Sequence, residues 1–187
     1  RRIALRRPRR SARLERGQVL LFPPGRLELP PEDDLRFLRD ELGALMTLKN
    51  ISYHPGGDYL SGIGGSPEAR ERTRAILRAH NETVARFLAP LLPEYADGWR
   101  RGKVNFRPLQ ERGRALSKHS SNERVHVDAF ASGATHGDRV LRFFTNVHPE
   151  APRVWRAAGL FPELYRECGA AAGIDGLGRR GLSAGLG

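Results

Sequence analysis

The sequence predicts an α+β fold in one domain. Two stretches, 31–46 and 66–93, carry apolar residues at helical spacing, whereas the part from Lys103 onward consists of short extended segments separated by Gly- and Ser-containing turns. A chain of 187 residues with 39% hydrophobic residues is sufficient for one domain with a sizeable core. We therefore expect N-terminal helices that pack on a sheet.

The two ends of the chain differ from this domain in composition. Residues 1–16 are rich in arginine and poor in acids, which is typical of a transit peptide, a basic arm for anionic lipid or an unstructured leader, and we expect this leader to be disordered. Residues 168–187 are rich in glycine and alanine, so we expect a disordered tail there. The folded domain is thus expected to span 17–167.

Proline, acidic and leucine positions predict the first elements. Gln18–Phe22 is an apolar run closed by Pro23 and Pro24, which predicts a strand ended by residues that cannot donate to a ladder. Pro31 and the three acids after it predict a helix that ends near 43–46. The leucines of this helix, expected to pack on a sheet, are Leu35, Leu38, Leu42 and Leu45.

A turn-rich stretch and a longer helix come next. Asn50–Gly65 is typical of a hairpin or a loop. Ser66 and Pro67 predict a capped helix start, and the prolines of Pro90–Pro93 predict its end. His80 lies on the apolar face of this helix, where we interpret it as a hydrogen-bonded core histidine rather than a metal ligand.

Three later segments predict strands, namely Val104–Phe106, Val125–Phe130 and Val140–Val147. In the last of them the side chains alternate between two faces. One face is expected to be core and the other partly polar. The core face carries Leu141, Phe143, Thr145 and Val147, and the other carries Val140, Arg142, Phe144 and Asn146.

The charge of the chain allows two interpretations. The formal net charge is +11, which suits an anionic partner such as nucleic acid or an acidic membrane surface. Lysine occurs at only three positions, however, so 29 of the 32 basic residues (32 − 3) are arginine, as a GC-rich coding bias would produce. We favour the coding bias as the origin of the positive charge, and we expect no specific nucleic acid partner.

Cysteine content and hydropathy indicate the compartment. A single cysteine, Cys168, excludes a disulfide within the chain and favours a reducing compartment. No apolar run approaches the roughly 20 residues needed to span a bilayer, and the first residues lack the apolar core of a secretory signal. We therefore expect a cytoplasmic protein.

The most specific chemical motif is His126-Val127-Asp128. Residues two apart on a strand point to the same side, so this imidazole and carboxylate can occupy adjacent positions on one metal ion. Two histidines and one carboxylate leave open positions on Fe(II) for a 2-oxo acid and dioxygen, and the motif supplies two of these three ligands. The spacing alone is also common in structural pairs.

Four segments together resemble the Kdo hydroxylases. These are bacterial Fe(II)/2-oxoglutarate dioxygenases that hydroxylate 3-deoxy-D-manno-oct-2-ulosonic acid (Kdo), a sugar acid of the lipopolysaccharide inner core, at its 3-position. The resemblance covers Gln18 to Leu164. The segments match in order and are Lys49–Tyr53, Asn105–Pro108, Ser117–Phe130 and Gly137–Asn146.

The resemblance implies a double-stranded β-helix, or jelly-roll, core with flanking N-terminal helices and the metal at its mouth. It also implies Fe(II) as cofactor, 2-oxoglutarate as co-substrate, and His126 and Asp128 as the matching metal ligands. The implied substrate is a Kdo-containing lipid A precursor, so peripheral contact with the anionic inner face of the inner membrane is expected.

The same resemblance implies a third ligand that the chain does not supply. In this superfamily a distal histidine and a basic residue for 2-oxoglutarate lie well downstream of the first two ligands. The only later histidines are His136 and His148, and we interpret both as turn residues, with a replacement metal ligand as the less favoured alternative, chiefly for His148. We therefore expect an incomplete jelly roll that lacks its C-terminal strands. A truncated or inactive form of the enzyme is one interpretation of this pattern.

Four polar residues near the motif are candidates for ligand binding. Lys118 and Arg124 suit a sugar carboxylate or phosphate, with solvated surface charge as the alternative. Arg142 and Asn146 share a strand face and suit the 2-oxoglutarate site, with hydrogen bonding inside the barrel as the alternative. The alternative function is a non-catalytic binding module for an anionic partner, lipopolysaccharide or nucleic acid.

Overall fold

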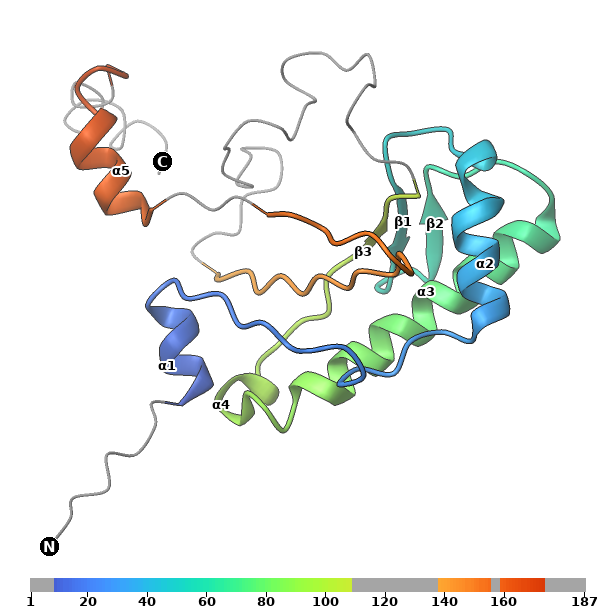
Figure 1. Cartoon of the computed structure of the whole chain (residues 1–187), viewed down its shortest axis with the longest axis horizontal. Coiled ribbons are helices and arrows are strands. Elements are labelled where there is room, and N and C mark those ends of the chain that lie inside the picture. The colour runs from blue at the N-terminus through green and yellow to red at the C-terminus, as the bar shows by residue number, and fades with distance from the viewer. Residues whose placement is uncertain (1–8, 109–137, 156–158, 174–187) are drawn as a thin grey trace, which may run out of the picture.

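The computed structural model describes residues 9–108, 138–155 and 159–173. Figure 1 gives the arrangement of the described helices and strands. They combine helices with a small antiparallel sheet, which confirms the α+β class. In chain order the elements are α1 (Arg10–Glu15), α2 (Glu32–Asp40), the 3₁₀ helix η1 (Leu42–Leu45), β1 (Ile51–His54), β2 (Tyr59–Ser61), α3 (Pro67–Leu88), α4 (Pro93–Ala96), β3 (Val104–Phe106) and α5 (Phe161–Cys168).

The described sheet has the strand order β2-β1-β3, and both pairings are antiparallel. Strands β1 and β2 form the hairpin that was one of the two predictions for Asn50–Gly65. Its turn includes Asp58 at a φ of 48°, a conformation that aspartate tolerates better than most residues. Strand β3, predicted at Val104–Phe106, pairs with the other edge of β1 and places Asn105 opposite Ser52.

Helices α2 and α3 begin where the sequence predicts. Three acids occupy the first turn of α2, where their negative charge interacts favourably with the helix dipole and stabilises the helix. The predicted helix over 31–46 divides into α2 and η1, since Gly43 is a weak helix former at this point. Ser66 caps α3, because its Oγ accepts a hydrogen bond from the amide of Ala69 at 3.3 Å. Helix α3 ends at Leu88, just before Pro90.

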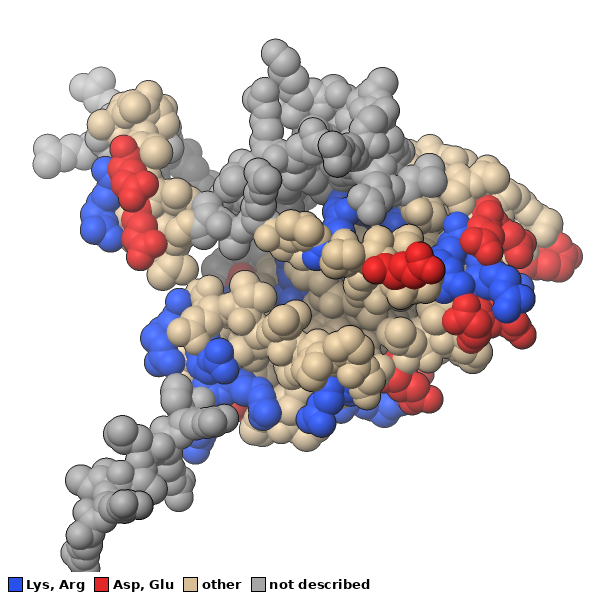
Figure 2. Space-filling view, viewed as in Figure 1, with Lys and Arg blue, Asp and Glu red and all other residues tan. Residues whose placement is uncertain are grey.

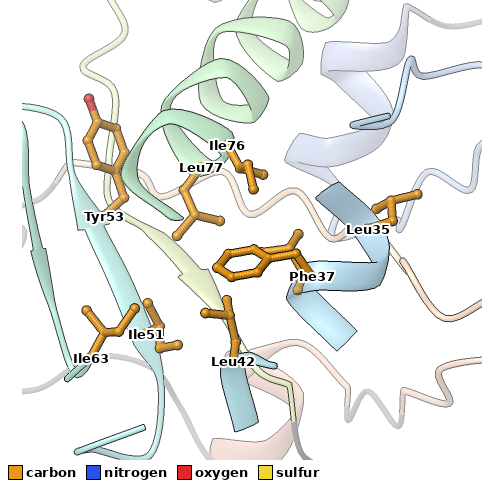
Figure 3. Packing of buried hydrophobic residues seen from close by; sticks show 9 residues of the cluster. Leu35, Phe37, Leu42, Ile51, Tyr53, Ile63, Ile76 and Leu77 are labelled. Carbon is orange, nitrogen blue, oxygen red and sulfur yellow. The ribbon is translucent and has the colours of Figure 1, made fainter. Parts of the chain in front are cut away.

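The core lies between the sheet, α2 and α3 (Figure 3). Leu35, Leu38 and Leu42 are all buried in it, which confirms that the leucine face of this helical segment packs toward the sheet. Strand β1 contributes Ile51 and Tyr53, which are 0% and 3% exposed. Burial of an apolar side chain of this size stabilises a fold by about 1.5 to 3 kcal/mol. This cluster therefore fixes β1 against the helices.

Residues 138–147, called the strap below, run in an extended form against α3. Phe143, Thr145 and Val147 are half-buried, whereas the residues between them are exposed, so the predicted alternation is confirmed at these positions. Leu141, which was predicted on the core face, is 43% exposed. The strap forms no ladder with any described strand, so the predicted strand Val140–Val147 is wrong there. Among the described residues, the segment is held by side-chain contacts, namely Thr145 with His80 and Phe143 with Phe87.

The predicted strand Gln18–Phe22 is also wrong. Its residues have no described ladder partner, although Leu20 and Phe22 are half-buried while Val19 and Leu21 are exposed. The ring of Phe22 packs edge-on against Phe87 of α3, with 5.1 Å between ring centroids. The apolar run therefore packs on a helix rather than pairing with a strand.

Three short helices, α1, α4 and α5, occur where none was predicted. Helix α1 lies within the range expected to be a disordered leader, and it is tied to α4 by an Arg9 to Glu94 ion pair of 3.1 Å. Helix α5 ends at Cys168, where the tail was predicted to begin. Pro162 in its first turn and Glu163, whose carboxylate accepts from the Leu160 amide at 3.1 Å, are the signals that indicate this helix.

No helix in the described ranges is both long and apolar enough to cross a membrane.

Candidate metal and cosubstrate site

The described segments that precede and follow the His126-Val127-Asp128 motif in the chain are β3 and the strap. His126, Asp128, Lys118 and Arg124 themselves lie outside the described residues. Within the described ranges, no group of three or more His, Cys, Asp and Glu side chains is arranged to hold a metal ion. The two metal ligands and the two substrate-binding residues therefore stay predictions.

The pairing of β1 with β3 joins two of the segments that carry the family resemblance. Ser52 Oγ donates a hydrogen bond to Asn105 Oδ1 at 2.8 Å, across the strand pair. Arg107 Nε donates to Asn50 Oδ1 at 2.7 Å on the same side. Segments Lys49–Tyr53 and Asn105–Pro108 thus form one polar unit.

The polar side chains of these two segments lie on one face of the sheet. Side chains alternate along a strand, and Ile51 and Tyr53 of β1 point into the core, so the residues between and beside them belong to the opposite face. Ser52 is only 8% exposed there. We call this surface the polar sheet face; its residues are Asn50, Ser52, His54, Asn105 and Arg107.

The polar sheet face offers amide, hydroxyl, imidazole and guanidinium groups together. His54 Nε2 lies 2.9 Å from Ser61 Oγ, and its ring stacks on Tyr59 with 4.4 Å between centroids. Groups of these kinds suit a ligand that is both hydroxylated and acidic. Sequence analysis did not identify this face, although the alternation Asn50, Ser52, His54 is the signal that indicates it.

The opposite side of β1 is occupied by a structural cluster. Tyr53 donates a hydrogen bond to Asp58 Oδ1 at 2.9 Å, and Arg74 of α3 forms an ion pair with the other carboxylate oxygen. The Tyr53 bond and the Arg74 charge lower the pKa of Asp58, whereas burial and the bond to Asp58 raise the pKa of Tyr53. Both groups therefore keep their ordinary neutral-pH forms and attach the hairpin to α3.

Arg142 and Asn146 both lie on the exposed side of the strap. Asn146 Nδ2 donates to the carbonyl of Ala151 at 2.8 Å, and its Oδ1 accepts from the His148 amide at 3.2 Å. His148 Nδ1 accepts from the amides of Glu150 and Ala151. His148 is therefore a turn residue, as predicted, and Asn146 supports the same turn. Contact of Arg142 and Asn146 with 2-oxoglutarate stays a prediction.

His80 is a hydrogen-bonded core histidine, as predicted. Its Nε2 lies 3.2 Å from Thr145 Oγ1 of the strap. Its Nδ1 is buried and has no hydrogen-bond partner among the described residues. Burial lowers the pKa of His80, because the charged imidazolium loses hydration. The imidazole therefore packs α3 against the strap in its neutral form.

Comparison with known proteins identifies the family. The sequence model of the 3-deoxy-D-manno-oct-2-ulosonic acid (Kdo) hydroxylases matches residues 4–173. The chain belongs to the Kdo hydroxylase family. This membership confirms the resemblance inferred from the four segments, and the match extends on both sides of the expected 17–167 domain. It favours an enzyme over a non-catalytic module for an anionic partner.

Solved Kdo hydroxylases share the fold of the matched part. The apo structure of the Kdo hydroxylase KdoO and its cobalt(II) complex are each 33% identical to the chain, with a TM-score of 0.50. In both cases the match covers 57% of this chain and 35% of the solved one, so the chain spans about a third of the length of these relatives. A comparison with curated proteins gave no match.

The descriptions of these relatives also confirm the expected type of cofactor. Both structures are described as non-heme Fe(II) alphaketoglutarate-dependent dioxygenases. Fe(II) and 2-oxoglutarate are therefore the cofactor and co-substrate of the proteins that this chain resembles. The described residues contain the helices and a small sheet of that fold, while the complete jelly roll belongs to the proposal below.

Proposed function

We propose that this chain contributes the first part of the metal site of an Fe(II)/2-oxoglutarate-dependent enzyme that hydroxylates Kdo in the lipopolysaccharide inner core. The match of the family model over residues 4–173 is the observation that carries this proposal. The motif His126-Val127-Asp128 lies inside the matched range. The proposed core is a jelly roll whose first part comprises the described sheet.

The donor set fits the metal. His126 and Asp128 would hold Fe(II) through one imidazole nitrogen and one carboxylate oxygen, which are the ligand types of non-haem iron oxygenases. When bound with 2-oxoglutarate and dioxygen, the iron supplies the oxidising power for the reaction. The protein's own task is then to bind the ligands, orient the sugar and exclude water from the reacting atoms.

Basic and amide groups supply the orientation in this proposal. Lys118 and Arg124 bind the acidic groups of the sugar, because both side chains remain cationic at neutral pH. Arg142 and Asn146 contact the carboxylate of 2-oxoglutarate. The polar sheet face adds hydrogen-bonding groups for the sugar hydroxyls. We further propose a Kdo-containing lipid A precursor as the substrate, which places the reaction at the cytoplasmic side of the inner membrane.

Binding of Co(II), a redox-silent substitute for Fe(II), tests the metal site. Replacement Asp128→Ala is expected to weaken Co(II) binding by more than about 100-fold, because a first ligand contributes more than the outer groups that orient it. Asp40→Ala is the matched control, since Asp40 is an exposed carboxylate at the end of α2. Isothermal titration calorimetry measures both. Equal Co(II) affinity in Asp128→Ala and the unaltered chain would remove the site.

Turnover tests the substrate separately. Succinate release from 2-oxoglutarate is expected to depend on a Kdo-bearing lipid A acceptor and to be absent with acceptors that lack Kdo. Mass spectrometry of the acceptor should show the addition of one oxygen atom. A chain that binds Co(II) through Asp128 but oxidises an unrelated acceptor would keep the metal site and exclude Kdo as the substrate.

A further inference from the structure

A groove opens between α1, residues 19–26 and the C-terminal end of α3. Its volume is 540 Å³, within the range of about 300 to 1,000 Å³ that holds small organic ligands. We call it the α1 groove. Its half-buried lining residues include Leu20, Phe22 and Phe87, and its exposed lining residues include Arg10, Arg13 and Arg26.

Both walls of the α1 groove are fixed to the rest of the fold. Phe22 contacts Phe87 at 5.1 Å and Phe143 at 6.3 Å between ring centroids, so the apolar wall is held by α3 and the strap. Helix α1 is held by the Arg9 to Glu94 ion pair and by the hydrogen bond that Tyr95 donates to Glu15. The groove is therefore formed before any ligand binds.

Two aliphatic side chains project from the same wall into solvent. Val19 is 78% exposed and Leu21 is 92% exposed. They alternate with the half-buried Leu20 and Phe22. One face of this short segment therefore packs against α3, and the other is exposed to solvent. Single exposed apolar residues are common, but two beside an apolar groove form a surface suited to an apolar medium.

Positive charge is concentrated around this surface. Residues 9–26 contain five arginines and one acid, Glu15, which already forms an ion pair with Arg139. Arg10, Arg16 and Arg26 have no acidic partner within the described ranges. Figure 2 shows basic side chains gathered near α1, whereas acidic and basic side chains mix at the opposite end near α2.

Several arginines of α2 and α3 form ion pairs with nearby acids. Arg72 of α3 binds the carboxylate of Asp34 through two nitrogens, at 3.1 and 2.9 Å. Arg74 forms ion pairs with Asp58 and Glu71. The net positive charge of the described chain is thus not spread evenly, and the α1 end offers cations that remain available to an external anion.

We propose that the α1 groove, together with Val19 and Leu21, is a docking surface for anionic lipid. Guanidinium groups of Arg10, Arg13 and Arg26 bind the anionic headgroup, and the aliphatic side chains enter the acyl region. Attraction between basic residues and an anionic leaflet adds to this apolar contact. A nucleic acid would use the same charges but would leave the aliphatic pair without a role.

This inference rests on the proposed function, because a membrane-bound lipid A precursor requires the enzyme at the membrane surface. Its test measures binding without turnover, however. Loss of lipid binding with an intact Co(II) site would remove only the docking surface, and loss of the Co(II) site with intact lipid binding would remove only the oxygenase proposal.

Co-sedimentation with phosphatidylcholine vesicles, with and without phosphatidylglycerol, tests the docking surface. The full chain is expected to bind only the vesicles that contain phosphatidylglycerol. Arg10→Gln and Arg26→Gln should each reduce this affinity about fivefold, and Leu21→Ser about tenfold. The matched controls are Arg70→Gln, an exposed arginine on α3, and Leu48→Ser, a leucine that is 61% exposed; neither should change binding.

Three outcomes would overturn the docking surface. The first is no binding of the unaltered chain to phosphatidylglycerol vesicles, and the second is an equal loss in the control variants. The third is unchanged vesicle binding in Leu21→Ser together with salt-sensitive binding to single-stranded DNA, which would identify a general polyanion surface instead. Circular dichroism of each variant establishes that the fold is retained, as expected for exposed positions.

Discussion

At Gly62 the chain leaves β2 with a φ of 80°, a conformation that favours glycine. A Cβ atom at this position would lie 2.1 Å from the carbonyl oxygen of Asn50, so neither the conformation nor the space permits a side chain. Asn50 is also the residue that accepts the hydrogen bond from Arg107. One glycine thus determines how closely the hairpin returns to the start of the polar sheet face.

Gly62→Ala is expected to lower the free energy of unfolding by about 2 kcal/mol or more, since it adds both backbone strain and a clash with main-chain atoms. Gly56→Ala is the control in the same hairpin, because a Cβ atom there meets no atom within 4 Å. Its effect should stay within about 0.5 kcal/mol. Urea unfolding measures both, and similar losses in the two variants would contradict this interpretation.

His80 gives the fold a pH dependence of known sign. Burial lowers its pKa in the folded chain below the ordinary value of 6.5. As pH falls below that value, the unfolded chain takes up a proton while folded His80 remains neutral, so the free energy of unfolding falls with pH. The contribution of neutral His80 to the free energy of unfolding is fully present above the pKa of the unfolded chain and diminishes below it.

Comparison with His80→Gln isolates this contribution. Glutamine retains a polar group near Thr145 but does not titrate. Between about pH 7.5 and about pH 5.5, the unaltered chain is expected to lose more unfolding free energy than His80→Gln does. Urea unfolding at the two pH values provides the measurement. Parallel losses in both proteins would assign the pH dependence to other groups.

At the scale of elements, the strap depends on side chains that face α3. Phe143 contacts Phe22 and Phe87, whereas its neighbour Phe144 is 57% exposed and packs on Trp155, itself 55% exposed. The strap therefore carries the same side chain in two surroundings, packed against α3 at Phe143 and largely exposed at Phe144. If only the replacement of Phe143 lowers the free energy of unfolding, the Phe143 side of the strap is the side that holds it against α3.

Phe143→Ala is expected to cost about 2 kcal/mol of unfolding free energy, and Phe144→Ala clearly less, because more of the Phe144 ring is already in water. Hydrogen exchange should also reveal faster exchange of the Phe22 region in Phe143→Ala. An equal cost for the two replacements would mean that the strap is not held through its alternating inner face.

The same elements mark how far the sequence predicts the fold. Periodicity, proline and capping residues are local signals. They predicted α2, the start of α3 at Ser66 and β3, and they predicted the hairpin as one of two alternatives. The runs at 18–22 and 140–147 have the alternation of strands, but alternation identifies which side is buried and not whether a strand lies alongside. For this reason both were predicted as ladder strands, and both pack against α3.

At the scale of the whole molecule, the proposed site comprises two groups of residues. His126 and Asp128 follow from a motif and a family, and they lie outside the described residues. The polar sheet face was missed because Asn50, Ser52 and Asn105 are ordinary residues until β1 and β3 are paired.

The pairing pattern of β1 also constrains the order of folding. One edge of β1 meets β2 through a short turn, while the other meets β3, where Asn105 comes 53 positions after Ser52 in the sequence. Closing a short turn costs little entropy, whereas the distant contact must await the folding of the intervening helices. The surface that joins Ser52 to Asn105 should therefore mature late, and a nascent or refolding chain would acquire its hairpin well before the polar sheet face is complete.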